Sequence, residues 1–234
     1  MTVTLPARTL PANSSTFDRV SVQPKRLVAV GDSLVYGYGD PEGGGWVERL
    51  RRQWLQPETP GPAIYNLGVR GDGVRLVAQR LESEFRNRGE LRNRLPDAVL
   101  LSVGVNDSAR VGRPDGRPYT DEATFGAAMA ALLDQAQALG PVLFVGMTPV
   151  WSEPMPFAEV LYYSHRDQYR YKEITRRACQ QRQIPYLDIF DLWLGRGEIW
   201  WRSRLSSDGL HPNVLGYRAL VEDITQWSAF QGLV

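Results

Sequence analysis

The chain has 234 residues, 43% of them hydrophobic, a size that suits one large domain or at most two small ones. Its formal net charge is +1, so no global electric field attracts nucleic acid or a membrane surface. No run approaches the ~20 apolar residues of a membrane span, and the single cysteine, Cys179, excludes an intramolecular disulfide. We therefore expect a soluble cytoplasmic protein with no nucleic-acid partner and no membrane span.

The N-terminal segment differs in character from the rest of the chain. It is rich in Thr, Ser, Pro and Ala and lacks an apolar core of signal-peptide length. No internal repeat, low-complexity tract or later shift in composition marks a second boundary. We interpret residues 1–24 as an N-terminal arm and residues 25–234 as one domain.

Short apolar runs recur at wide intervals along that domain. They are nearly continuous rather than alternating, which is typical of parallel strands covered on both faces. The predicted strands are Arg26–Val30, Ala63–Leu67, Ala98–Val103, Val142–Met147 and Pro185–Ile189.

Segments with helical spacing separate these runs. Trp46, Leu50 and Trp54 recur every four residues, and the apolar residues of 74–85 and 125–133 repeat every three to four. Gly140-Pro141 ends the third of these segments. A fourth helix is predicted from about Ala158 to Gln181 and a last one from about Val214 to Phe230. This alternation indicates a doubly wound, mostly parallel sheet with its ligand site at the carboxyl ends of the strands.

Four short motifs lie near those expected strand ends, and together they place a serine, a histidine and an aspartate at one rim. These three side chains are the parts of a nucleophilic hydrolase. The motifs are Gly31-Asp32-Ser33-Leu34-Val35-Tyr36-Gly37, Asn66-Leu67-Gly68-Val69-Arg70-Gly71-Asp72, Gly104-Val105-Asn106-Asp107 and Asp208-Gly209-Leu210-His211-Pro212.

In their order and placement, the motifs resemble the four sequence blocks of the SGNH hydrolase (GDSL esterase/lipase) superfamily, from Arg26 to about Phe230. The resemblance implies an α/β fold, a flavodoxin-like three-layer αβα sandwich with a five-stranded, mostly parallel sheet. It also implies a serine hydrolase that cleaves small acyl esters through an acyl-enzyme intermediate. Such an enzyme is an esterase, with a thioesterase or a lipase-like enzyme as the related activities. An O-acyltransferase or a carbohydrate O-deacetylase with the same Ser-His-Asp site is the alternative.

The resemblance also implies the catalytic residues. Ser33 is similar to the family's nucleophile, and a serine hydroxyl needs an adjacent base at neutral pH. His211 takes the role of that base, and Asp208 orients the imidazole. Asp188 and Asp191 are alternative partners for the histidine, although they lie farther from it in sequence.

The family's oxyanion hole takes two backbone N–H donors and one asparagine amide. By block, Ser33, Gly71 and Asn106 match these positions. Gly68 competes with Gly71, but Gly71 fits the block better because Gly-Asp follows Asn66 at the matching interval.

The substrate-binding residues are expected beside the nucleophile and in the loop after the fourth strand. Trp151 and Phe157 in that loop, and Tyr36 next to the first motif, are the candidates for contact with a small-molecule acyl ester. The glycines between Gly37 and Gly45 predict a mobile loop beside the nucleophile. With two histidines and one cysteine, the chain offers no paired metal-ligand spacing, so we expect neither a metal nor another cofactor. The sequence does not indicate an oligomeric state.

Overall fold

The computed structural model describes residues 25–56, 58, 61–89 and 94–234, and the predicted N-terminal arm lies outside them. Its main sheet has five strands, all parallel, in the order β2-β1-β3-β5-β7. The strands are β1 (Arg26–Gly31), β2 (Ala63–Gly68), β3 (Ala98–Ser102), β5 (Val142–Val145) and β7 (Tyr186–Leu187). Each contains the centre of one predicted strand, so the predicted α/β sheet is confirmed.

The order of the strands explains where the site lies. The chain steps from β1 to β2 on one side and later places β3 on the other side of β1. This is the flavodoxin-like order, and ligands bind in such sheets where the two halves diverge, outside the carboxyl ends of the strands. In register, Gly31 at the end of β1 faces Gly68 of β2 and Ser102 of β3.

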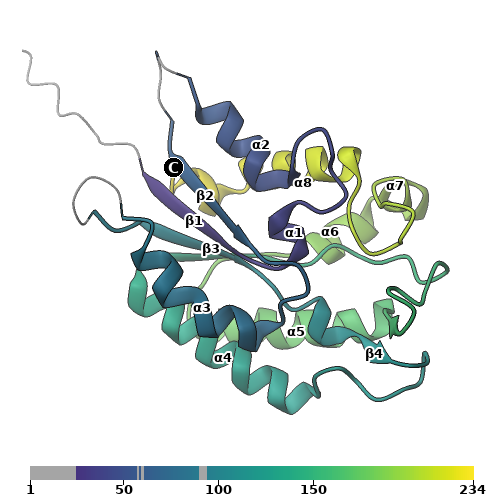
Figure 1. Cartoon of the computed structure of the whole chain (residues 1–234). Helices are drawn as coiled ribbons and strands as arrows, with labels where there is room; N and C mark the ends of the chain where they lie inside the picture. Colours follow the sequence, from purple (N-terminus) through teal and green to yellow (C-terminus); the bar gives the residue numbers. More distant parts are fainter. Residues whose placement is uncertain (1–24, 57, 59–60, 90–93) are drawn as a thin grey trace, which may run out of the picture.

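Helices cover both faces of the sheet, which gives the predicted three layers (Figure 1). On one face lie α2 (Gly45–Trp54) and α8 (Val214–Gln226), together with α6 (Ile189–Gly195) and α9 (Ser228–Gln231). On the other lie α3 (Val74–Arg86), α4 (Glu122–Leu139) and α5 (His165–Gln181).

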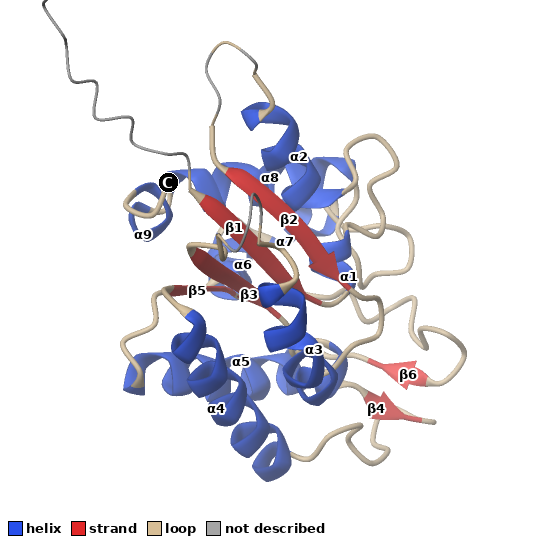
Figure 2. Ribbon diagram, turned by 60° about the vertical axis from the view of Figure 1, so that its left-hand side comes forward, coloured by secondary structure: helices blue, strands red, loops and turns tan. Residues whose placement is uncertain are grey.

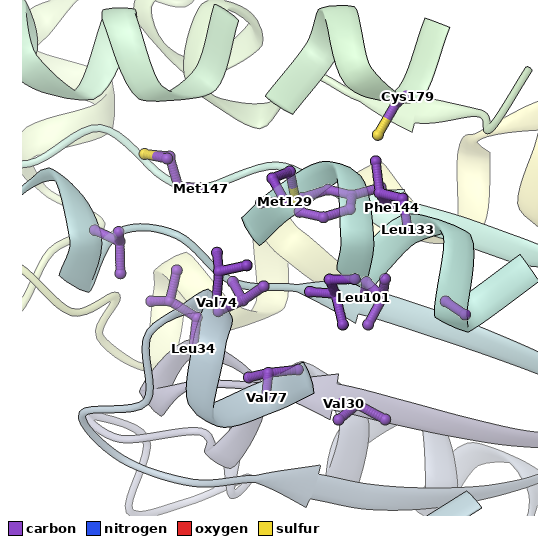
Figure 3. Packing of buried hydrophobic residues seen from close by; sticks show 14 of the residues in the cluster. Val30, Leu34, Val74, Val77, Leu101, Met129, Leu133, Phe144, Met147 and Cys179 are labelled. Atoms are coloured by element: carbon purple, nitrogen blue, oxygen red, sulfur yellow. The ribbon is translucent and has the colours of Figure 1, made fainter. Parts of the chain in front are cut away.

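Alternate residues of one strand serve these two layers. Leu27 and Ala29 of β1 pack toward α2 and α8, whereas Val28 and Val30 pack toward α3 and α4. Figure 3 shows the apolar core between the sheet and the layer of α3, α4 and α5. There, Val77, Met129 and Leu133 from the helices cover strand residues such as Val30 and Phe144. Burial on both faces is the reason the strands read as continuous apolar runs.

The fourth predicted helix begins later than the sequence indicated. Helix α5 starts at His165, and the Ser164 side chain caps it by accepting a hydrogen bond from the Asp167 N–H. Upstream, Ala158 and Glu159 adopt positive φ angles, a conformation incompatible with a right-handed helix. The prediction that this helix starts at Ala158 is therefore wrong.

A small second sheet occupies the segment that precedes α5. Strand β6 (Leu161–Tyr162) pairs antiparallel with β4 (Arg110–Val111). Figure 2 shows this pair of short strands beyond the end of the sheet that carries α1 (Ser33–Tyr36). Strands of two residues carry no periodicity, which is why the sequence did not indicate them.

The C-terminal region also contains more helix than expected. The predicted last helix is divided at Trp227 into α8 and α9. Helix α7 (Glu198–Arg202) lies between the predicted fifth strand and the predicted last helix, where no helix was predicted. None of the helices in the described part of the chain has the length and apolar character needed to cross a membrane.

Candidate active site

Ser33, His211 and Asp208 form one hydrogen-bonded chain at the carboxyl end of the sheet. The Oγ of Ser33, the first residue of α1, lies 2.9 Å from Nε2 of His211. The Nδ1 of the same imidazole lies 2.7 Å from Oδ2 of Asp208. Ser33 and His211 are buried, with 4% and 2% of their surfaces exposed. An imidazole held between a hydroxyl and a carboxylate is arranged to move a proton to and from that hydroxyl.

The Asp208 carboxylate is kept ionised by its hydrogen bonds. Burial alone raises its pKa, but the bond with the His211 ring and the backbone N–H groups of His211 and Leu210 outweigh burial and hold the pKa below its ordinary value. The same backbone bonds fix the turn that carries both side chains. At neutral pH, Asp208 therefore stabilises a positive charge on the imidazole.

A pocket of about 440 Å³ opens above Ser33 and His211. Asn106, in the 3-10 helix η1 (Asn106–Ser108) after β3, lines it. Its Nδ2 donates to the carbonyl of Asp72 at 2.9 Å, and its Oδ1 lies 3.4 Å from the Tyr163 hydroxyl. The complete lining is Ser33, Arg70, Gly71, Asn106, Tyr119, Phe157, Leu161, Leu210 and His211.

The two competing glycines occupy different environments. Gly71 lines the pocket at a φ of +84°, and a Cβ added there would meet no atom within 4 Å. Gly68 ends β2, and its N–H donates to Oδ1 of Asn66. A Cβ on Gly68 would lie 2.1 Å from the backbone nitrogen of Tyr36, so this glycine permits the close approach of α1 to β2. Only Gly71 of the two faces the pocket.

Two aromatic rings flank His211. The centre of the Tyr38 ring lies 4.5 Å from the centre of the imidazole, and the centre of the Phe157 ring lies 5.5 Å from it. Both are edge-to-face contacts. Phe157 was a predicted substrate-binding residue and lines the pocket. Tyr38, like the pocket residues Arg70 and Tyr119, was not among the predicted substrate-binding residues, because an aromatic or basic residue in a loop carries no periodic signal.

The glycine-rich loop between α1 and α2 is held by a buried carboxylate. Asp40 accepts hydrogen bonds from the N–H groups of Gly43 and Gly45 and a bidentate pair from Arg49. The side chain of Asp40 is 0% exposed, and these bonds outweigh burial and keep its pKa below the ordinary value. The glycines are thus required by the tight turns of a braced loop, which differs from the mobile loop that the sequence predicted.

The other two predicted substrate-binding residues lie away from this pocket. Trp151 lines a separate cavity with His165 and Trp201, and the Arg202 guanidinium lies 4.2 Å from its ring. The backbone N–H of Trp151 donates to the Gly209 carbonyl in the turn that carries His211. Tyr36 is 52% exposed at the end of α1 and is not part of the pocket lining.

Asp32 and Asp107, which lie within two of the sequence motifs, have structural roles. Asp32 caps α1 by accepting from the Leu34 N–H, while its Oδ2 is buried with no partner among the described residues. Burial, with smaller effects from Asp107 and Asp72, raises the pKa of Asp32 to about 7 against the opposing Leu34 bond. The Asp107 carboxylate accepts hydrogen bonds from the Val74 N–H and from the Thr120 hydroxyl.

The alternative partners for the histidine are engaged elsewhere. Asp188 and Asp191 both bind the ammonium group of the buried Lys172, and neither contacts His211. Arg110, the first residue of β4, is held in a bidentate pair with Asp167. Neither group of charges belongs to the pocket.

Solved structures share the fold at low sequence identity. The lipase/acylhydrolase from Enterococcus faecalis is 20% identical with a TM-score of 0.68, over 86% of this chain and 94% of that chain. TesA is 22% identical with a TM-score of 0.65, over 90% and 100% of the two chains. Axe2, an acetylxylan esterase from Geobacillus stearothermophilus, is 19% identical with a TM-score of 0.62, over 85% and 91%.

Sequence comparison gives the family. No curated protein sequence matches the chain. The family model of the GDSL-like lipase/acylhydrolase family matches residues 29–219, which include all four motifs. The chain therefore belongs to the GDSL-like lipase/acylhydrolase family and is a carboxylic ester hydrolase.

Proposed function

We propose that the protein hydrolyses small acyl esters through an acyl-enzyme intermediate on Ser33. The observation that carries the proposal is the continuous hydrogen-bonded chain from Ser33 through His211 to Asp208 at the base of the pocket. In this proposal Ser33 is the nucleophile, His211 is the general base and acid, and Asp208 orients the imidazole.

The first half-reaction acylates the serine. The Oγ of Ser33 attacks the ester carbonyl carbon as its proton passes to Nε2 of His211, which lies 2.9 Å away. The tetrahedral intermediate then collapses, the bond from carbon to the alcohol oxygen breaks, and the His211 imidazolium donates its proton to the departing alkoxide. The product alcohol leaves, and the acyl group stays on Ser33 as an ester.

The second half-reaction returns the serine. Water gives one proton to the neutral imidazole of His211 while its oxygen attacks the acyl carbon. The second tetrahedral intermediate expels the Ser33 oxygen, which takes back the proton from His211, and the carboxylic acid is released. The ionised Asp208 carboxylate stabilises the imidazolium that forms in each half-reaction.

We propose that the oxyanion of each tetrahedral intermediate is bound by the Ser33 N–H, the Gly71 N–H and the Asn106 amide. Asn106 and Gly71 both line the pocket that contains Ser33, and the Gly68 N–H is already bonded to Asn66. One such donor typically contributes about 10²–10³ in turnover.

The pocket favours short acyl groups. Its apolar lining comes from Phe157, Leu161 and Leu210, and its volume of about 440 Å³ is at the small end of ligand pockets. Trp151 and Tyr36 are left out of the substrate-binding assignment because the pocket does not include them.

The test is hydrolysis of p-nitrophenyl esters of graded chain length, with acyl thioesters and acetylated sugars as further substrates. Wild-type protein is compared with Ser33→Ala and with Ser83→Ala, which removes an exposed hydroxyl on α3. We expect turnover of short esters by wild type and Ser83→Ala and its loss in Ser33→Ala. Full activity in Ser33→Ala refutes the proposal, and acyl transfer to an added sugar at the expense of hydrolysis identifies a transferase instead.

A further inference from the structure

Arg70 brings a positive charge to the pocket that holds Ser33. It immediately precedes Gly71, it is exposed, and it lines the pocket with Ser33 and His211. Its Cζ lies 4.0 Å from the centre of the Tyr38 ring, and that ring in turn contacts the His211 imidazole. One aromatic ring therefore separates the guanidinium from the catalytic histidine.

The contact with Tyr38 positions the guanidinium and leaves its hydrogen-bond donors free. The Arg70 Cζ lies over the Tyr38 ring, and a cation–π contact of this kind uses none of the five N–H donors of the group. Within the described residues, Arg70 has no hydrogen bond and no ion pair. The acid nearest to it in sequence, Asp72, is occupied by Arg80 at 2.8 Å. Arg80 itself is held further by the carbonyls of Leu67 and Gly31.

The rest of the lining does not neutralise this charge. Among the described residues that form the pocket wall, none is an aspartate or a glutamate, and most of the remainder are apolar or aromatic. The Asp208 carboxylate behind the pocket is engaged with His211. An oriented, unpaired guanidinium beside an apolar wall favours an anion that accepts two parallel hydrogen bonds.

We propose that Arg70 selects esters that carry an anionic group, a carboxylate or a phosphate, close to the scissile bond. The anion binds the free edge of the Arg70 guanidinium while the ester carbonyl lies at Ser33. This rests on the proposed function, since it assigns the substrate class of the same site. The anionic group stays unchanged in the reaction, and its part is to hold the ester in place.

Paired substrates test the proposal. On the acyl side, mono-4-nitrophenyl glutarate is compared with its neutral methyl ester, and on the alcohol side 4-acetoxybenzoate is compared with methyl 4-acetoxybenzoate. Each is assayed with wild type, with Arg70→Met, which keeps a long apolar stem beside Tyr38, and with Arg70→Lys. Arg166→Met removes an exposed arginine that does not line the pocket and serves as the charge-matched control.

We expect Arg70→Met to lower kcat/KM for at least one anionic substrate by about tenfold or more, with its neutral partner changed less than about twofold. The loss identifies whether the anion lies on the acyl or the alcohol side. Arg70→Lys retains part of the effect, and added salt weakens it in wild type. Equal losses on charged and neutral partners, or no loss on either anion, overturn the inference. If Ser33→Ala also hydrolyses these esters, the proposed function itself fails.

Discussion

The imidazole Nε2 of His211 lies 2.9 Å from the hydroxyl oxygen of Ser33, although 178 residues separate the two in the chain. Ser33 follows β1, an interior strand that lies between β2 and β3. His211 precedes α8, and α8 packs against α2 on one face of the sheet. The backbone around His211 is tied down by the bond from the Ser206 N–H to its carbonyl and by the bond from the Trp151 N–H to the Gly209 carbonyl. The sheet and this braced turn thus bring the two side chains together before substrate binds.

Loss of the Asp208 charge should slow turnover without removing the nucleophile. Asp208→Asn removes the carboxylate that holds the His211 ring and compensates its positive charge. We expect kcat for a short p-nitrophenyl ester to fall by about 10⁴-fold, with thermal stability nearly unchanged. Asp115→Asn, at an exposed acid on the loop after β4, is the control. Near-normal turnover in Asp208→Asn would show that another group orients the histidine.

The hydroxyl of Tyr163 should act as a positioning group for Asn106. The tyrosine is buried, and its hydroxyl donates to Oδ1 of Asn106 at 3.4 Å. It therefore favours the amide orientation in which Oδ1, and not Nδ2, faces Tyr163. We expect Tyr163→Phe to lower kcat by about tenfold with little change in KM, because the hydrogen bond orients Asn106, the proposed oxyanion donor.

A second buried tyrosine supplies the control. The Tyr171 hydroxyl also donates to a protein oxygen, the Thr120 carbonyl, but Tyr171 is not part of the pocket lining. Tyr171→Phe should affect stability and leave kcat near the wild-type value. Equal kcat losses in the two variants would mean that the Tyr163 hydroxyl only supports the fold.

Alanine at each of the competing glycines separates catalysis from folding. Gly71→Ala places a Cβ in open space but at a φ of +84°, so relief of strain re-aims the N–H, and kcat should fall while the protein stays folded. Gly68→Ala should destabilise the fold by several kcal/mol because its Cβ collides with the α1 backbone.

The control for Gly71 is matched in backbone conformation. Gly112 has a φ of +80°, and a Cβ there also meets no atom within 4 Å, but it lies outside the pocket. Gly112→Ala should carry a similar strain of roughly 1 kcal/mol with unchanged kcat. The oxyanion assignment fails if Gly71→Ala retains wild-type kcat at a reduced melting temperature.

The buried Asp32 should make stability depend on pH. Its pKa is raised to about 7 from an ordinary value of 3.8, so between these values the folded protein holds a proton that the unfolded chain has released. The contribution of Asp32 to the free energy of unfolding therefore falls as pH rises through this range. Asp32→Asn removes the titration and keeps an oxygen for the Leu34 N–H.

Urea denaturation at several pH values measures this effect. The variant should gain stability relative to wild type, by roughly 1–4 kcal/mol, between about pH 4 and pH 8. A difference in unfolding free energy that stays constant over this range would show that Asp32 is ionised throughout. Comparing the two proteins removes the contribution of Asp208, which is common to both.

Much of the fold could be predicted from the sequence because both faces of the sheet are buried. The continuous apolar runs around Val28 and Leu100 have no other simple interpretation at this spacing. What could not be predicted depends on contacts distant in sequence. The β4–β6 pair joins Arg110 to Tyr162. The late start of α5 depends on the N-cap that the Ser164 side chain provides and on the turn before it.

The same distinction holds for the site. Ser33, Asn106 and His211 stand in motifs, and the motifs locate them at strand ends. The pocket wall is different, since Tyr119 and Leu161 belong to no motif and meet there only through folding. Trp151 shows the converse error, because its position in an apolar loop near the site did not determine the direction of its side chain.

Covalent labelling tests the central claim most directly. Wild-type protein is treated with a p-nitrophenyl alkylphosphonate, which reacts with an activated serine, and intact-mass measurement and peptide mapping follow. We predict one adduct per chain, located on Ser33, with activity lost in proportion to labelling and no adduct in Ser33→Ala. An adduct on any other residue, or an unlabelled Ser33 in a fully inactivated protein, would contradict the account.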